Sequence, residues 1–367
     1  MNKPVREASA AQKAMIVDCD IHPLQKSKAD LLPFLEKGWR DHMKTFGGNI
    51  RQGLWAGQNV YPRMMAGGRR ADAFPPNGGP PGSDLDFMRK QHLDPNGVEC
   101  GMLICGNGSG MEERNLDYGA ALSHAVNEWQ IEFFARPEPR LRAGVVVPQE
   151  NAEAAVREIE ARASDRRFSQ VIISPRANEP LGRRRYWPIY AAAEAAGLPM
   201  GIHNSNVNGG HASTGSGWPT FYIGEHYAFV PHAQAMAVSM IMEGVFERFP
   251  KLKVVSIESG YTWAPALGWR MDRHWEKMRA ETPHLKRPPS EYLRDHFWFT
   301  TQPVEEPDDP AHLAEMFDWI GWDKMLFSTD YPHWDYDDPQ YAIRFPMSDE
   351  RRAALFRGNA RALYRLD

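Results

Sequence analysis

Short apolar runs alternate along the chain with longer stretches in which apolar residues recur every three or four positions. The short runs have the composition of strands buried on both faces, and the longer stretches have the spacing of amphipathic helices. The pattern predicts eight strands, at Met15–Asp20, Glu99–Cys105, Leu141–Val147, Gln170–Ser174, Leu198–His203, Leu252–Glu258, His296–Thr300 and Lys324–Ser328. It predicts helices at Tyr118–Ala135, Ala152–Ala163, Trp187–Ala196, Pro231–Phe249, Ala264–Arg279, Pro310–Trp319 and Asp349–Arg365.

Eight strand–helix units favour a closed (β/α)8 TIM barrel over an open doubly wound sheet, and no GxGxxG motif follows the first strand. We expect residues 1–14 to form an N-terminal tail and residues 15–367 a single barrel domain. Two insertions interrupt the pattern, at about 47–81 after the first strand and 204–230 after the fifth. The first is expected to be a lid or cap, and both are expected to face the substrate.

Composition narrows the class of partner. A net charge of −4, from 43 basic and 47 acidic residues, provides no electrostatic surface for nucleic acid or an anionic membrane. Three cysteines are too few for a disulfide framework, and no apolar run reaches the length of a membrane span or a signal-peptide core. We therefore expect a cytoplasmic protein whose partner is a small molecule or another subunit.

Ionisable residues end several of the predicted strands. Asp18, Asp20 and His22 alternate along the first strand and therefore point to one face, the last two near its carboxyl end. His203, Glu258 and Asp330 end or follow three other strands. Each of these residues alone can be explained as a helix cap or a loop hydrogen bond. Together they indicate a divalent-metal site, because a buried strand rarely ends in a charge.

The motifs VDCDIHP, GIHNSN, FERFPKLKVVSIESG, FSTDYPHWD and GNARALY resemble the amidohydrolase-2 branch of the amidohydrolase superfamily. That branch includes aminocarboxymuconate-semialdehyde decarboxylase and the resorcylate- and vanillate-type decarboxylases. The resemblance spans about Met15 to Leu366 and implies a (β/α)8 barrel with a catalytic divalent ion. It places the metal ligands on Asp20, His22, His203 and Asp330. This mixed nitrogen and oxygen set suits zinc, manganese or iron.

The chain departs from the family after the sixth strand. Relatives carry an acid/base histidine there in an HGGG-like stretch, whereas this chain has Glu258, Ser259 and Gly260. Glu258 can act as a general base, bind a metal, or form structural hydrogen bonds. His232, in FVPHAQAM, is expected either to face the same rim or to lie exposed at a helix start. With Glu258 it is the candidate ligand of a second ion.

Four further residues are candidates for binding substrate. His333 lies three residues after Asp330, and Arg51 and Arg270 are candidates for pairing with a substrate carboxylate. For each arginine the alternative is a solvated surface position, and His274 shares the helical face of Arg270. Trp218, with Trp55 and Trp334, is a candidate for the pocket wall.

The leading hypothesis is a metal-dependent decarboxylase or hydrolase acting on a small carboxylated organic substrate. Asp330 would act as ligand and proton acceptor, and Glu258 or His232 would transfer the proton. One alternative is a hydroxylase that activates oxygen at a dinuclear iron or manganese–iron centre on the same fold. Another is a non-catalytic partner subunit, which predicts missing ligands. The relatives imply a homodimer or a related hetero-oligomer.

Overall fold

The computed structural model describes residues 15–46, 68–105, 109–111, 113–203, 217 and 219–366. Eight parallel strands follow one another in chain order around a barrel, as the sequence predicts. Each strand pairs with the next one along the chain. Their bounds are β1 (Ile16–Ile21), β2 (Val98–Leu103), β3 (Leu141–Val146), β4 (Phe168–Ile173), β5 (Met200–His203), β6 (Val254–Ile257), β7 (Phe297–Thr300) and β8 (Met325–Leu326).

Backbone contacts between the first strand and the segment after β8 close the ring. The Cys19 N–H donates to the Phe327 carbonyl at 3.0 Å, and the His22 N–H donates to the Tyr331 carbonyl at 2.8 Å. Ile21 and Tyr331 also form a parallel bridge. The carboxyl ends of β1 and β8 are therefore adjacent, which brings the first and last ionisable strand ends together.

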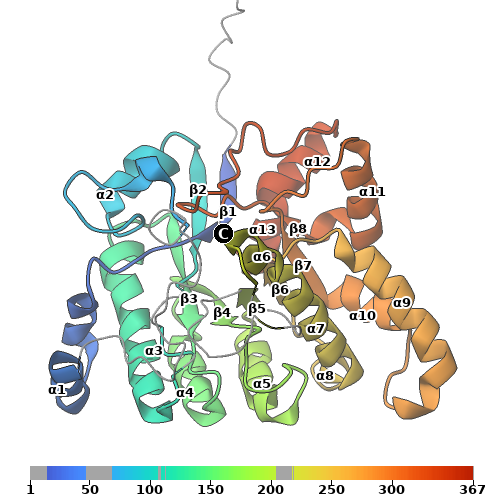
Figure 1. The fold of residues 1–367 in the computed structure, drawn as a ribbon, viewed down its shortest axis with the longest axis horizontal. Coiled ribbons are helices and arrows are strands. Elements are labelled where there is room, and N and C mark those ends of the chain that lie inside the picture. The colour runs from blue at the N-terminus through green and yellow to red at the C-terminus, as the bar shows by residue number, and fades with distance from the viewer. Residues whose placement is uncertain are drawn as a thin grey trace, which may run out of the picture.

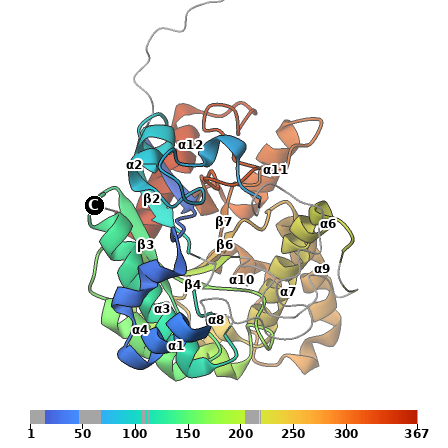
Figure 2. The same cartoon turned by 60° about the vertical axis from the view of Figure 1, so that its left-hand side comes forward.

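Helices surround the strands in Figures 1 and 2. They are α1 (Lys37–Phe46), α2 (Leu85–Met88), α3 (Leu116–Gln130), α4 (Ala152–Arg162), α5 (Trp187–Ala196), α6 (Tyr222–Tyr227), α7 (Phe229–Met242), α8 (Val245–Arg248), α9 (Trp263–Met278), α10 (Pro289–His296), α11 (Ala311–Ile320), α12 (Asp349–Ala353) and α13 (Asn359–Tyr364). Short 3-10 or π turns are η1 (Lys28–Phe34), η3 (Ala71–Ala73), η4 (Arg89–Leu93), η5 (Ile131–Ala135), η6 (Arg184–Tyr186), η8 (Arg279–Glu281), η9 (Trp322–Lys324) and η10 (Ala354–Gly358). Among the described residues, no helix combines the length and apolar character needed to cross a bilayer.

The prediction of one helix over Pro231–Phe249 is wrong. The chain begins the helix earlier, at Phe229, and divides it into α7 and α8. Gly244 between them adopts a left-handed conformation with φ +79°, which a residue without a side chain adopts at little cost. The hydrophobic spacing continues through this break, so periodicity alone did not reveal it.

Buried apolar side chains pack along the strands of the barrel. Val17, Leu103 and Ile172 are fully buried strand residues. Gly144 and Gly201 leave room for the Ile172 side chain. A Cβ on Gly144 would lie 2.4 Å from Ile172 Cγ1, and a Cβ on Gly201 would lie 2.7 Å from Ile172 Cδ1. Burying each such aliphatic side chain contributes about 1.5–3 kcal/mol.

Candidate metal centre

The first strand supplies two side chains to the rim. His22 Nδ1 lies 3.0 Å from the Ile104 carbonyl oxygen, which can only accept, so Nδ1 carries the proton. His22 Nε2 then faces the site, 2.9 Å from Asp20 Oδ1 and 2.8 Å from Asp330 Oδ1. Both Asp20 oxygens are buried without a hydrogen-bond partner. A ring held through Nδ1 by a carbonyl, with Nε2 facing carboxylates, has the orientation of a metal-binding histidine.

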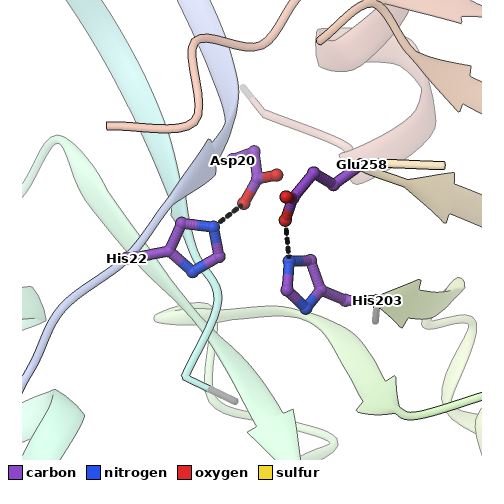
Figure 3. A group of neighbouring side chains, drawn as sticks. All are labelled: Asp20, His22, His203 and Glu258. Carbon is purple, nitrogen blue, oxygen red and sulfur yellow. Dashed lines mark hydrogen bonds and ion pairs between the residues drawn. The ribbon is translucent and has the colours of Figure 1, made fainter. Parts of the chain in front are cut away.

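The fifth and sixth strands supply a second pair, shown with the first in Figure 3. His203 ends β5, and its Nε2 lies 2.8 Å from Glu258 Oε2. His203 Nδ1 is buried without a hydrogen-bond partner. The Glu258 N–H donates to Thr300 Oγ1 at 3.1 Å, which fixes the backbone directly after β6. Figure 3 shows all four side chains pointing toward one another from three strands.

Asp330 follows β8 and is fully buried. Gln302 Nε2 donates to its Oδ2 at 3.3 Å, and its Oδ1 makes a short contact with His333 Nδ1. Asp330 and Glu258 have φ values of +61° and +51°. Residues other than glycine seldom adopt this left-handed region, and such backbone strain is concentrated at functional sites.

Burial and charge act differently on the two central carboxyl groups. Burial, together with the charges of Glu258, Asp335 and Asp20, raises the pKa of Asp330 well above its usual value. Burial would also raise the pKa of Glu258, but hydrogen bonds with His203 and His226 outweigh it and hold that pKa well below the usual range. Burial and the charge of Arg69 lower the pKa of His333. Asp330 therefore holds a proton more readily than Glu258.

The four residues that the resemblance selected lie together at the rim, but they divide between two groups of potential ligands. Asp20, His22 and His203 group with Glu258, and Asp330 groups with His22, Glu258 and His333. Within each group the ligand atoms lie within 4.8 Å of one another. Glu258 belongs to both groups, so it is as central as the four residues themselves.

A buried arginine faces this negative cluster. Arg69 is 5% exposed, and its Nη1 has no hydrogen-bond partner. Burial lowers the pKa of Arg69, while the charges of Asp330 and Glu258 raise it. An antiparallel bridge to His333 fixes its backbone beside the site. Sequence reasoning missed Arg69, since it lies in the first insertion, where no periodicity indicates which arginine turns inward.

A histidine from the second insertion also reaches the rim. His226 Nε2 lies 3.0 Å from Asp335 Oδ2 and 3.5 Å from Glu258 Oε1. Burial would lower the pKa of His226, but hydrogen bonds with Asp335 and Glu258 raise it to about 10. The insertion containing His226 was expected to face the substrate, whereas Asp335 was not singled out. Its only sequence signal is its place five residues after Asp330.

The structure does not bring the remaining described residues suggested by the sequence into the groups of potential metal ligands. His232 lies in the first turn of α7 and belongs to none of the described groups of potential metal ligands. Arg270 and His274 are exposed on α9. Arg51, Trp55 and Trp218 lie outside the described residues. Trp334 is 45% exposed, and its ring centroid lies 5.7 Å from that of His226, at the edge of the site.

Comparison with known sequences agrees with the family resemblance of the motifs. The family model described as amidohydrolase matches residues 17–366. A gamma-resorcylate decarboxylase from Polaromonas sp. is 24% identical over 301 residues, covering 77% of this chain and 88% of that protein. One from Rhizobium radiobacter is 24% identical over 294 residues, with the same coverage of 77% and 88%.

Solved structures resemble the fold over nearly the whole chain. A 5-carboxyvanillate decarboxylase from Novosphingobium aromaticivorans, with bound manganese and a nitrobenzoic acid, has a TM-score of 0.73 at 18% identity. The alignment covers 98% of this chain and 99% of that one. The 2,6-dihydroxybenzoate decarboxylase from Rhizobium, complexed with 2,6-dihydroxybenzoate, has a TM-score of 0.67 at 19% identity, covering 96% and 99%. At these identities the likeness supports the barrel fold.

Proposed function

The chain belongs to the amidohydrolase family, and from this premise we propose that it is a metal-dependent decarboxylase of hydroxylated aromatic carboxylates. The observation that carries the proposal is the convergence of Asp20, His22, His203 and Asp330 at one rim, opposite the buried Arg69. The chain retains every ligand-type residue that the family resemblance requires, which disfavours a non-catalytic partner subunit.

The donor atoms at this rim fit a divalent ion. Both oxygens of Asp20 and Nε2 of His22 are buried without a hydrogen-bond partner, so a cation would satisfy groups that are costly to bury alone. Imidazole and carboxylate ligands suit manganese, zinc or iron. Manganese is the ion we propose, because it is bound in the similar decarboxylase structure. When bound, the ion would polarise the substrate's oxygens.

Arg69 is the group proposed to bind the substrate carboxylate. Its guanidinium is buried and has a free Nη1, and a guanidinium forms paired hydrogen bonds with a carboxylate. Tyr222 and Trp334 pack beside the preceding residue, Gly68, with ring centroids 6.4 Å apart, and could border an aromatic ring. The names of the relatives support this class, because 2,6-dihydroxybenzoate and 5-carboxyvanillate both carry a hydroxyl beside the carboxyl group.

Decarboxylation needs a proton at the carbon that loses CO2. The C–C bond to the carboxylate breaks, CO2 leaves, and a proton takes its place on the ring. Asp330 is the proposed donor, because its carboxyl group contacts the His333 imidazole and the two groups together can hold and transfer a proton. The low pKa of Glu258 keeps that carboxylate ionised, so it could bind an ion but would not donate the proton.

A substrate panel tests this function. The manganese-loaded protein should release CO2 from 2,6-dihydroxybenzoate or 5-carboxyvanillate but not from benzoate, which lacks the adjacent hydroxyl. CO2 release would be measured together with the change in ultraviolet absorbance. Hydrolysis of an ester or amide, without CO2 release from any hydroxybenzoate, would contradict decarboxylation and leave the hydrolase alternative.

A further inference from the structure

We propose that the same rim holds a second divalent cation, bound by His226, Asp335 and Glu258. The inference rests on the proposed metal site, because Glu258 would be shared between the two ions. These three residues form a separate group whose ligand atoms lie within 4.8 Å of one another.

The two oxygens of Glu258 face two different imidazoles. Oε2 lies 2.8 Å from His203 Nε2, whereas Oε1 lies 3.5 Å from His226 Nε2. A carboxylate in this position can bind one ion through each oxygen. Carboxylates bridge in this way in two-metal sites, whose ions are about 3.5–4 Å apart. The second group is therefore continuous with the first through one side chain.

Ligand spacing at the second group suits a metal ion. His226 Nε2 lies 3.0 Å from Asp335 Oδ2 and 3.5 Å from Glu258 Oε1. Metal–ligand bonds of about 2.0–2.2 Å place neighbouring ligand atoms about 3–4 Å apart. The three atoms can thus be bound by one ion with small side-chain movements.

Asp335 has an oxygen available for this ion. Gln302 Nε2 donates to Asp335 Oδ2 at 3.0 Å, which holds the carboxylate toward the rim. Asp335 Oδ1 is buried without a hydrogen-bond partner. A buried carboxylate oxygen is costly to leave unpaired, and a cation would satisfy it.

The charge balance at the rim also leaves room for a second cation. Asp20, Glu258, Asp330 and Asp335 converge there, and Arg69 is the buried arginine that faces them among the described residues. When all four carboxylates are ionised and His226 is neutral, as a metal-binding imidazole must be, one divalent ion and Arg69 leave a net negative charge before a carboxylated substrate enters. A second divalent ion offsets that charge.

The proposal replaces His232 with His226 as the histidine of the second site. His232 belongs to none of the described ligand groups, whereas α6 directs His226 toward Glu258. Sequence order suggested His232 because it begins a long helix before β6. The structure shows that the short helix α6 precedes it and carries the imidazole that contacts Glu258.

Manganese stoichiometry and electron paramagnetic resonance test the second site. The full-length protein is loaded with Mn²⁺ without oxygen, and weakly bound ion is removed by gel filtration. The wild type should retain two ions per chain and show the spectrum of an exchange-coupled pair. His226→Ala and Asp335→Asn should each retain one ion with an uncoupled spectrum. His312→Ala, an exposed histidine on α11, should retain two coupled ions.

Each other result overturns this proposal in a distinguishable way. A wild type that retains one ion and releases CO2 removes the second site but leaves the proposed function intact. A wild type that retains no ion contradicts both. A second ion that is uncoupled, or that persists in both His226→Ala and Asp335→Asn, is bound elsewhere and contradicts the shared Glu258.

Discussion

The carboxylate of Asp18 accepts two hydrogen bonds from Thr329, one from its N–H at 2.9 Å and one from its hydroxyl at 2.6 Å. Thr329 immediately precedes Asp330. The same carboxylate forms a hydrogen bond with His92 Nε2 at 2.8 Å and accepts one from the Asp20 N–H at 3.2 Å. Asp18 is fully buried below the rim, so it links the backbones that carry two proposed metal ligands.

Asp18→Asn should weaken metal binding without contacting the metal. The amide nitrogen cannot accept a hydrogen bond from Thr329 or His92, so Asp20 and Asp330 lose a shared support. Changes to groups that orient ligands typically cost about 10–100-fold in metal affinity. Competition with a manganese chelator would measure the loss. Thr329→Val, which removes only the hydroxyl bond, should have a smaller effect, and unchanged affinity in Asp18→Asn would refute this supporting role.

His203→Ala should abolish both metal retention and activity. The variant removes an imidazole and leaves Glu258 without its partner at 2.8 Å. Elemental analysis after gel filtration provides the readout, and circular dichroism checks the fold. His312→Ala is the matched control, since His312 is exposed on α11. Full occupancy and a normal rate in His203→Ala would exclude it as a ligand.

Arg69→Met should raise KM for the carboxylated substrate about 10–100-fold, because a hydrogen bond to a charged group contributes about 1.5–3 kcal/mol. Its metal content should stay at the wild-type level, because Arg69 is a cation and cannot be a ligand. Arg69→Lys should recover part of the lost substrate affinity, since lysine keeps the positive charge but lacks the paired N–H donors of the guanidinium. Arg273→Met, on the exposed face of α9, should leave KM unchanged. An unaltered KM in Arg69→Met would remove Arg69 from substrate binding.

Glu138→Gln should lower stability at neutral pH but not in acid. Hydrogen bonds from Arg140 and Arg89 lower the pKa of Glu138 to about 2 from its usual 4.5. The ionised carboxylate therefore stabilises the fold fully above pH 4.5, and this contribution is lost as the pH falls toward 2. Urea unfolding should show a wild-type advantage at pH 7 that narrows below pH 4.5. A pH-independent difference would indicate lost packing rather than charge.

Periodicity predicted the barrel because each buried strand needs an apolar run, and ionisable residues such as His203 and Asp330 interrupt those runs at the rim. The same reasoning missed Arg69 and Asp335, which lie in irregular segments whose direction depends on distant contacts. Arg69 is positioned by its bridge to His333, and Asp335 by Gln302, more than thirty residues away in the chain. It also favoured His232 over His226, because a short helix inside an insertion has too few residues to show a period.

The most direct test of the account is an anomalous-difference map from crystals grown with manganese. We predict a peak at the carboxyl end of the barrel, within bonding distance of Asp20, His22, His203 and Asp330. A crystal in which these side chains enclose no anomalous peak, although manganese is present and the barrel is intact, would contradict the proposed metal centre and the reaction assigned to it.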